Sequence, residues 1–223
     1  EARRAQEEIA QHRGDDSGTV VAALSIMPHV GMLPYALKAF RERYPHIKLQ
    51  IIEGLFPDIE GPLREGAVDF YLGAAPRAAP APGLSMQRLF ENRRAVMSRK
   101  GHPKSSARSL KALECESWAI TGVDYNVEDD IGRLFESLGL KAPHVVLRAS
   151  SAMSLMVSLA HSDLLAMLPV QWEEFPMTRD ALQVIRVREL LPAPPIVLVQ
   201  RPDFPLTPAA DFFCDVLRRF SPT

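Results

Sequence analysis

Three segments of the sequence place hydroxyl side chains directly between an apolar, strand-like run and a helix. In an open α/β sheet, ligands bind beyond the carboxyl ends of the strands, and the free N–H groups of a helix N-terminus hold anions. The three segments therefore predict a cleft for a small anion. Phe56, after another strand, would either add an apolar wall or belong to the core. The same hydroxyls are also good helix caps, and the sequence leaves both interpretations open. The segments begin at Ser25 (with Met27 and His29), Thr121 (with Tyr125) and Ser150-Ser151.

No motif typical of catalysis accompanies these segments. The sequence has no nucleophile elbow, P-loop, G-x-G-x-x-G, H-E-x-x-H or C-x-x-C pattern. Cys115 lies between Glu114 and Glu116, whose carboxylates disfavour a thiolate. Residues 161–163 (HSD) have the residue types of a catalytic triad, but a triad assembles in space and not from neighbours in sequence, so we predict a turn there. The acidic residues 128–130 favour a helix start over a metal site. We therefore expect no enzyme, no cofactor and no metal.

The first candidate segment lies in a β-α-β-α-β pattern. Its first strand is the apolar run Val20–Leu24, as a strand buried on both faces requires. Apolar residues then recur at helical spacing over 33–44 and 59–63, and alternate with polar ones over 47–51 and 68–72. This order predicts three parallel strands with right-handed crossovers.

A second α/β set and a closing helix follow. Strand-like runs lie at 94–97, 118–120, 145–147, 164–168 and, more weakly, 182–187, with helices at 109–114, 127–138 and 151–159. Thr207-Pro208 begins a last helix with an apolar stripe through Phe220. Segments 74–83 and 192–195 are Pro-rich connectors. Segment 74–83 can be interpreted either as an approach to a hinge or as a surface loop.

We predict an α/β fold of two Rossmann-like lobes joined by two crossing strands. The predicted parts are the end of a linker helix (1–16), lobe I (17–90 and 193–223) and lobe II (91–192).

Composition excludes several classes of protein. The 26 Lys and Arg residues balance 27 Asp and Glu, for a net charge of −1, which is unlike a protein that neutralises phosphates by itself. The two cysteines, Cys115 and Cys214, predict free thiols in a reducing compartment. The chain has no apolar run long enough for a membrane span, and it begins with neither a signal peptide nor Met. We expect a cytoplasmic fragment.

Several runs together resemble one family. This chain contains the run MLPYALKAFRERYPHIKLQIIEG. It resembles the pattern L-P-x-x-L-x-x-F-x-x-x-Y-P of the effector-binding domain of LysR-type transcriptional regulators. Later motifs of that family are similar, in the same order, to LREGAVDFYLG, GHP, SSAMSLMVSLAHSDLLAMLP and TPAADFFCDVLRRF. EARRAQEEI resembles the end of the linker helix that leads to the DNA-binding head. Each motif is weak alone, but the ordered set covers essentially the whole chain.

The resemblance implies the fold of type 2 periplasmic binding proteins, with a small effector between two lobes. It also implies homodimers through this domain, homotetramers of the full-length protein, and promoter DNA bound by an N-terminal winged helix-turn-helix. We expect this chain, which lacks that head, not to bind DNA by itself. The effector positions carry over to Ser25, Met27, His29, Phe56, Thr121, Tyr125 and Ser151.

The chain departs from the family at three places. Residues 161–163 stand where many members have a Gly-rich turn, and Met27 and Phe56 stand where many have polar residues. These differences predict a more apolar pocket. AHSDLL and GLFPDIEGPLREG are similar to the branch that contains a toluenesulfonate-responsive regulator, which implies an aromatic acid or sulfonate effector. The alternatives are a solute-binding protein of a transport system and an enzyme on the same fold.

Overall fold

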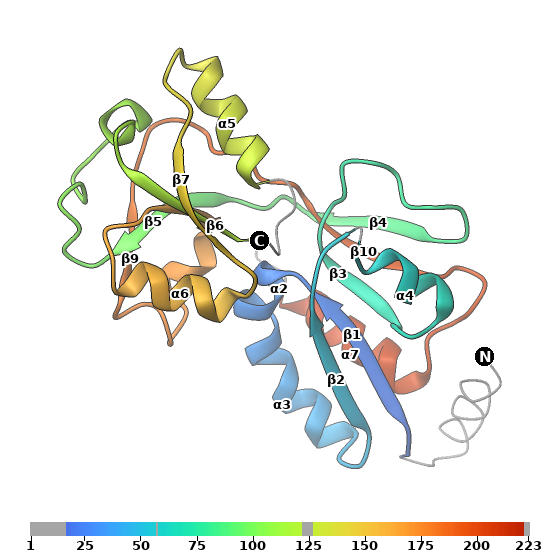
Figure 1. The fold of residues 1–223 in the computed structure, drawn as a ribbon. Coiled ribbons are helices and arrows are strands. Elements are labelled where there is room, and N and C mark those ends of the chain that lie inside the picture. The colour runs from blue at the N-terminus through green and yellow to red at the C-terminus, as the bar shows by residue number, and fades with distance from the viewer. Residues whose placement is uncertain (1–16, 57, 122–126, 221–223) are drawn as a thin grey trace. The chain divides into compact units, whose positions relative to one another are not determined.

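A computed structural model describes residues 17–56, 58–121 and 127–220 of the chain (Figure 1). The predicted linker helix over 1–16 and Tyr125 lie outside these ranges. The chain divides into two compact units. Unit 1 comprises Glu1–Glu91 and Pro194–Thr223, and unit 2 comprises Asn92–Ala193. The chain therefore passes from unit 1 to unit 2 and back again.

Unit 1 contains a five-stranded sheet in the order β2-β1-β3-β10-β4. β1 pairs in parallel with both β2 and β3, which confirms the predicted β-α-β-α-β arrangement. β10 returns from the end of the chain and pairs antiparallel with β3 and β4. The strands are β1 (Thr19–Leu24), β2 (Lys48–Glu53), β3 (Phe70–Ala74), β4 (Ser85–Phe90) and β10 (Ile196–Gln200).

The helices of unit 1 begin and end where local signals predict. Gly66, with φ of 77°, provides the left-handed C-cap that ends the predicted short helix. Thr207 caps the last helix, its Oγ1 accepting a hydrogen bond from Ala210 N at 3.3 Å, and Pro208 follows as the first helical residue. The helices are α2 (Ile26–Gly31), α3 (Leu33–Arg43), α4 (Glu60–Glu65) and α7 (Pro208–Arg219).

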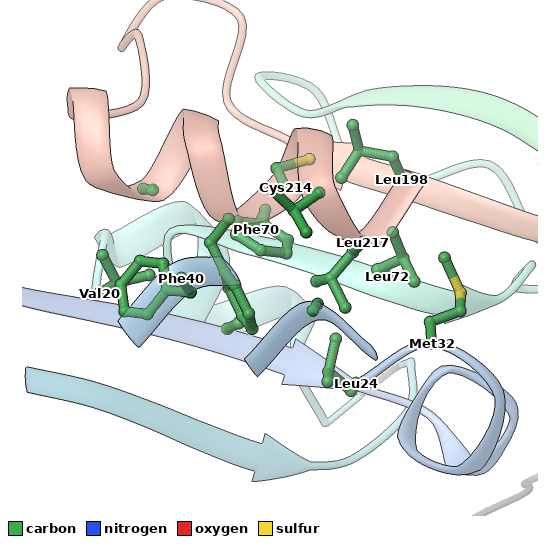
Figure 2. Close-up of a cluster of buried hydrophobic side chains, with 14 of the residues drawn as sticks. Val20, Leu24, Met32, Phe40, Phe70, Leu72, Leu198, Cys214 and Leu217 are labelled. Carbon is green, nitrogen blue, oxygen red and sulfur yellow. The ribbon is translucent and has the colours of Figure 1, made fainter. Parts of the chain in front are cut away.

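The core of unit 1 lies where α3 and α7 meet the sheet (Figure 2). Phe213 of α7 has its ring centroid 5.0 Å from that of Phe40 on α3 and 6.2 Å from that of Phe70 on β3. Leu24, Leu72, Leu198 and other apolar side chains of the strands complete the cluster. One helix from each of the two chain segments of unit 1 therefore packs into the same core.

Unit 2 repeats the strand order of unit 1. β6 pairs in parallel with β7, and a parallel bridge between Trp118 and Leu165 connects β6 to the residue just before β8. β5 pairs antiparallel with β8 and β9, so the order is β7-β6-β8-β5-β9. In each unit three parallel strands are followed by one strand that runs in the opposite direction, β10 or β5, and then by an edge strand, β4 or β9, that pairs antiparallel with it. The strands are β5 (Arg94–Arg99), β6 (Ser117–Thr121), β7 (His144–Ala149), β8 (Ala166–Pro169) and β9 (Leu182–Ile185).

Two α-helices and two 3-10 turns accompany this sheet. A core of apolar side chains, among them Trp118 and Phe135 in edge-to-face contact at 5.7 Å, lies between α5 and the strands. The helices are α5 (Val127–Ser137) and α6 (Ala152–Ala160), and the 3-10 turns are η1 (Leu110–Leu113) and η2 (Val170–Glu173).

The Pro-rich segment 74–83 is not a crossing between the units. It joins β3 to β4 within unit 1, and Ala75 N donates a hydrogen bond to Pro195 O at 2.8 Å. Its interpretation as a surface loop is therefore the correct one. The chain enters unit 2 between Glu91 and Asn92, directly after β4.

Residues 161–163 form the predicted turn between α6 and β8. Asp163 Oδ1 accepts a hydrogen bond from Arg99 Nε at 2.8 Å. His102 Nδ1 accepts from Lys104 N at 3.0 Å, so its Nε2 carries the proton and donates to Asp163 O at 3.1 Å. The His-Pro motif thus holds the turn through the imidazole of His102.

The two cysteines differ sharply in exposure. Cys115 is exposed and Cys214 is buried in the core of unit 1, and both are free thiols as predicted. Burial raises the pKa of Cys214 to about 12. Among the described residues, no helix is long and apolar enough to cross a membrane.

We expect a thiol reagent at pH 8 to label one cysteine per folded chain and two after denaturation, because only the thiolate reacts. A raised pKa means that the folded state holds its proton more tightly. The free energy of unfolding should therefore fall as pH rises from about 9 towards 12. Peptide mapping of the labelled chain checks the site; rapid modification of Cys214 in the folded state would contradict its burial.

Candidate functional site

Ser25 lies at the carboxyl end of β1, beside the end of β3. Its backbone N donates to Leu72 O at 3.1 Å, and its Oγ accepts a hydrogen bond from Ala74 N at 3.2 Å. The side chain is only 4% exposed and makes no cap to α2. Ser25 is therefore not the helix cap that one interpretation of the sequence predicts. Its hydroxyl joins two neighbouring strand ends.

An aromatic pair lies next to Ser25. The rings of Phe56 and Tyr71 meet edge to face at 5.2 Å, and the Tyr71 hydroxyl donates to Ala74 O at 2.9 Å. Gly73 makes this arrangement possible, because a Cβ there would overlap the Tyr71 hydroxyl and lie 2.7 Å from Ser25 Cβ. The Phe56 ring thus packs against a second aromatic ring, that of Tyr71. Sequence analysis missed Tyr71, whose position in a buried strand is typical of the core.

Met27 and His29 occupy different environments. Met27 is 1% exposed and belongs to the core cluster of unit 1. The Met27 side chain thus packs against the sheet, and its role as an effector contact stays a prediction. His29 is half-buried, and its Nδ1 lies 3.1 Å from Ser25 O. Since a carbonyl only accepts, Nδ1 is the donor in this contact.

In unit 2 the predicted residues also follow parallel strands. Thr121 is buried at the end of β6 and pairs with Ala149 of β7. Ser151 caps α6, its Oγ accepting from Ser154 N at 3.2 Å and donating to Ser154 Oγ at 3.0 Å. The cap interpretation therefore holds for Ser151. In the shared strand order Thr121 takes the place that Ser25 has in unit 1, and Ser151 follows β7 as Phe56 follows β2.

The third parallel strand of unit 2 leads to a pair of residues that sequence analysis missed. Within the described part of the chain, Gln171 Oε1 and Trp172 Nε1 are buried without a hydrogen-bond partner. Both follow the end of β8, at the same edge of the sheet as Thr121. A buried polar atom without a partner is costly, and a ligand or water can satisfy it. The only signal in the sequence is a glutamine two residues after the strand's terminal proline.

The described strand ends carry hydrogen-bonding groups. Over residues 17–56, 58–121 and 127–220, no group of three or more His, Cys, Asp or Glu side chains is placed to hold a metal ion. What the strand ends offer is hydroxyls, an amide, backbone N–H groups and aromatic faces. Such groups bind and orient a small molecule.

A comparison with protein families decides the identity of the domain. Residues 13–221 match the model of the LysR substrate binding domain. The chain belongs to this family. As a LysR substrate-binding domain it is a binding domain rather than an enzyme, in agreement with the expectation from the sequence.

Named relatives of this LysR domain are transcriptional regulators. The chain is 25% identical over 211 residues to the HTH-type transcriptional regulator GalR of Pseudomonas putida, an alignment that covers 94% of this chain and 53% of that protein. It is 18% identical over 185 residues to TdcA of Escherichia coli, covering 83% of this chain and 59% of that protein. The chain thus spans little more than half the length of these relatives.

Solved structures share the fold of this LysR domain. The CcmR regulatory domain of Synechocystis PCC6803, in complex with 2-PG, superposes with a TM-score of 0.73 at 18% identity, over 91% of this chain and 96% of that one. The effector-binding domain of QuiR, in complex with shikimate, superposes with a TM-score of 0.71 at 14% identity, over 92% and 97%. The predicted fold, two α/β lobes of the periplasmic-binding-protein type, is confirmed.

Proposed function

We propose that this chain is the effector-sensing and oligomerisation domain of a LysR-type DNA-binding transcriptional regulator. It binds a small anionic, aromatic ligand between the lobes. The observation that carries the proposal is the shared strand order, which gives both units hydroxyl-bearing strand ends in equivalent places. Ligands of such sheets bind beyond the carboxyl ends of parallel strands.

The chemistry of the strand ends favours the ligand class. An anion is favoured by the N-terminus of α6 at Ser151, because free N–H groups and the helix dipole attract negative charge. The hydroxyls of Ser25 and Thr121 can donate further hydrogen bonds to it. The Phe56–Tyr71 pair favours a flat ring, which prefers an aromatic edge or face. An aromatic carboxylate or sulfonate, as in the toluenesulfonate-responsive branch, meets both requirements. His29, Gln171 and the sequence-predicted Tyr125 are further contacts in this proposal.

The mechanism follows from differential affinity. A ligand that touches both lobes binds one inter-lobe angle better than another, and it shifts the equilibrium only by that difference. In the full-length protein, a cytoplasmic regulator, the change passes through dimer and tetramer contacts to N-terminal heads on promoter DNA. The names of the relatives support this assignment.

A ligand panel with matched pairs tests the proposal. Benzoate and toluenesulfonate should raise the Tm, whereas neutral benzamide and non-aromatic cyclohexanecarboxylate should raise it less. At 100 times its Kd a ligand adds about 2.7 kcal/mol to the free energy of unfolding. For a chain of this size that is a rise of roughly 5–10 °C. Thermal unfolding checks this, and equal shifts for benzoate and benzamide would exclude an anion site.

Ser25→Ala locates the site. Loss of one hydrogen bond to a charged ligand should weaken binding about 10- to 100-fold. Ser106→Ala, in an exposed turn, is the matched control and should bind like the native chain. Equal affinities for both variants would remove Ser25 from the site.

A further inference from the structure

A buried arginine lies where the chain enters unit 2. Arg94 is the first residue of β5, and its side chain is only 2% exposed. A buried guanidinium needs partners, because desolvation of a charge is costly. Its Nη1 lies 3.5 Å from Asp130 Oδ2 on α5 and donates to Pro192 O at 3.2 Å. Arg94 thus contacts a carboxylate on α5 and the backbone carbonyl of Pro192.

These two partners belong to segments that matter for movement between the units. Pro192 lies directly before the point, between Ala193 and Pro194, where the chain leaves unit 2. Asp130 lies in the first turn of α5, shortly after Thr121 in the chain. A single side chain therefore joins the entry into unit 2, the exit from it and the start of α5.

The surrounding contacts strengthen both ends of this connection. Arg93 O accepts a hydrogen bond from Val170 N at 3.1 Å, and Arg94 pairs with Pro169 in the β5–β8 register. These contacts fix the entry segment to the end of β8. Asp130 Oδ1 also lies 3.3 Å from Arg133 Nη2, so its carboxylate has a second cation. The exit segment, which contains prolines, has fewer backbone donors of its own, and the Arg94 bond uses the carbonyl of Pro192.

We propose that Arg94 is a positioning residue that fixes both crossings of the chain to unit 2. Bending between the units is then confined to residues 91–92 and 193–195. Because the same guanidinium holds α5, a shift of the first turn of α5 on ligand binding is transmitted to both crossings at once. This inference rests on the proposed function, in which the inter-lobe angle is the signal.

Replacing Arg94 and Asp130 by apolar side chains distinguishes the positioning role of Arg94 from a contribution to stability alone. Replacing a buried ion pair by apolar side chains of similar volume is often neutral or stabilising. The double variant Arg94→Met/Asp130→Leu should therefore keep its Tm within about 3 °C of the native value. It no longer has a donor for Pro192 O. The Tm of this variant therefore tests whether it folds, and a separate measurement tests whether the exit segment has lost its contact with unit 2.

The measurement is the distance distribution between two spin labels, one in each unit. Cys115 in unit 2 is exposed and accepts a label, whereas Cys214 is buried and does not. Lys38→Cys adds a label on α3 of unit 1, at a side chain that is 84% exposed. Electron–electron resonance on the full chain needs no effector, so its result does not depend on whether the proposed ligand is correct.

The double variant should broaden this distribution about twofold, because the exit segment loses its anchor. Arg94→Lys keeps a charge for Asp130 but loses the planar fork, and should also broaden it. Arg186→Met, which removes an exposed ion pair with Glu173 in unit 2, is the control and should leave the width unchanged. Native width in Arg94→Lys, or in a folded double variant, would overturn the proposal.

Discussion

Gly73→Ala is expected to destabilise the chain by about 1–3 kcal/mol, the usual cost of forcing an extra carbon into a packed region. The new Cβ would overlap the Tyr71 hydroxyl and lie 2.7 Å from Ser25 Cβ. Neither neighbour can retreat easily, since Tyr71 donates to Ala74 O and Ser25 Oγ accepts from Ala74 N. The substitution therefore displaces two groups of the proposed site together. We expect urea unfolding to show the loss, and the Tm shift with benzoate to shrink in the same variant.

Gly61→Ala is the matched control. Gly61 lies in α4 of the same unit, and a Cβ there meets nothing within 4 Å. Since a Cβ has room there, this variant should stay within about 0.5 kcal/mol of the native stability. If Gly73→Ala were as stable as Gly61→Ala, the close approach of Ser25, Tyr71 and Gly73 would be wrong.

Phe213→Ala is expected to cost about 3–5 kcal/mol, the range for removing a fully buried phenylalanine. Phe213 is fully buried and contacts Phe40 and Phe70, so its loss opens a cavity between α7, α3 and β3. Phe220→Ala is the control, because Phe220 follows the same helix but its side chain is 42% exposed. It should cost well under half as much.

The two tryptophans allow this effect to be assigned to one unit. Trp118 and Trp172 both lie in unit 2, so their fluorescence reports on unit 2 alone. Circular dichroism at 222 nm reports on both units. In Phe213→Ala we expect the dichroism to begin to change at lower urea than the fluorescence. Coincident transitions, both moved by the same amount, would instead indicate that the two units unfold as one.

The sequence was sufficient for elements with local signals. β1 was predicted from a run of apolar residues, and α7 from Thr207-Pro208 and its apolar stripe. β4 was missed, because much of it is exposed and it is held by pairing with β10, more than a hundred residues later in the chain. The exposed sequence of β4 does not predict a strand unless its pairing with β10 is known.

The same distinction explains the candidate site. Ser151 shows its capping role locally, through a residue three positions later. Ser25 has its decisive partner in Ala74, 49 positions later, which no local pattern reveals. The burial of Met27 was not foreseen, because a helix as short as α2 has too few residues for its apolar face to be predicted. Tyr71 and Gln171 depend on which strands become neighbours.

The nesting of unit 2 within unit 1 affects how the protein is made. Residues 92–193 are continuous, so unit 2 can fold as soon as they leave the ribosome. Unit 1 cannot, since β10 lies between β3 and β4 and is synthesised only after the whole of unit 2. Until then β3 has an unpaired, apolar edge, the kind that draws nascent chains into aggregates. We therefore expect chaperones to bind the first segment of unit 1 while unit 2 is being synthesised.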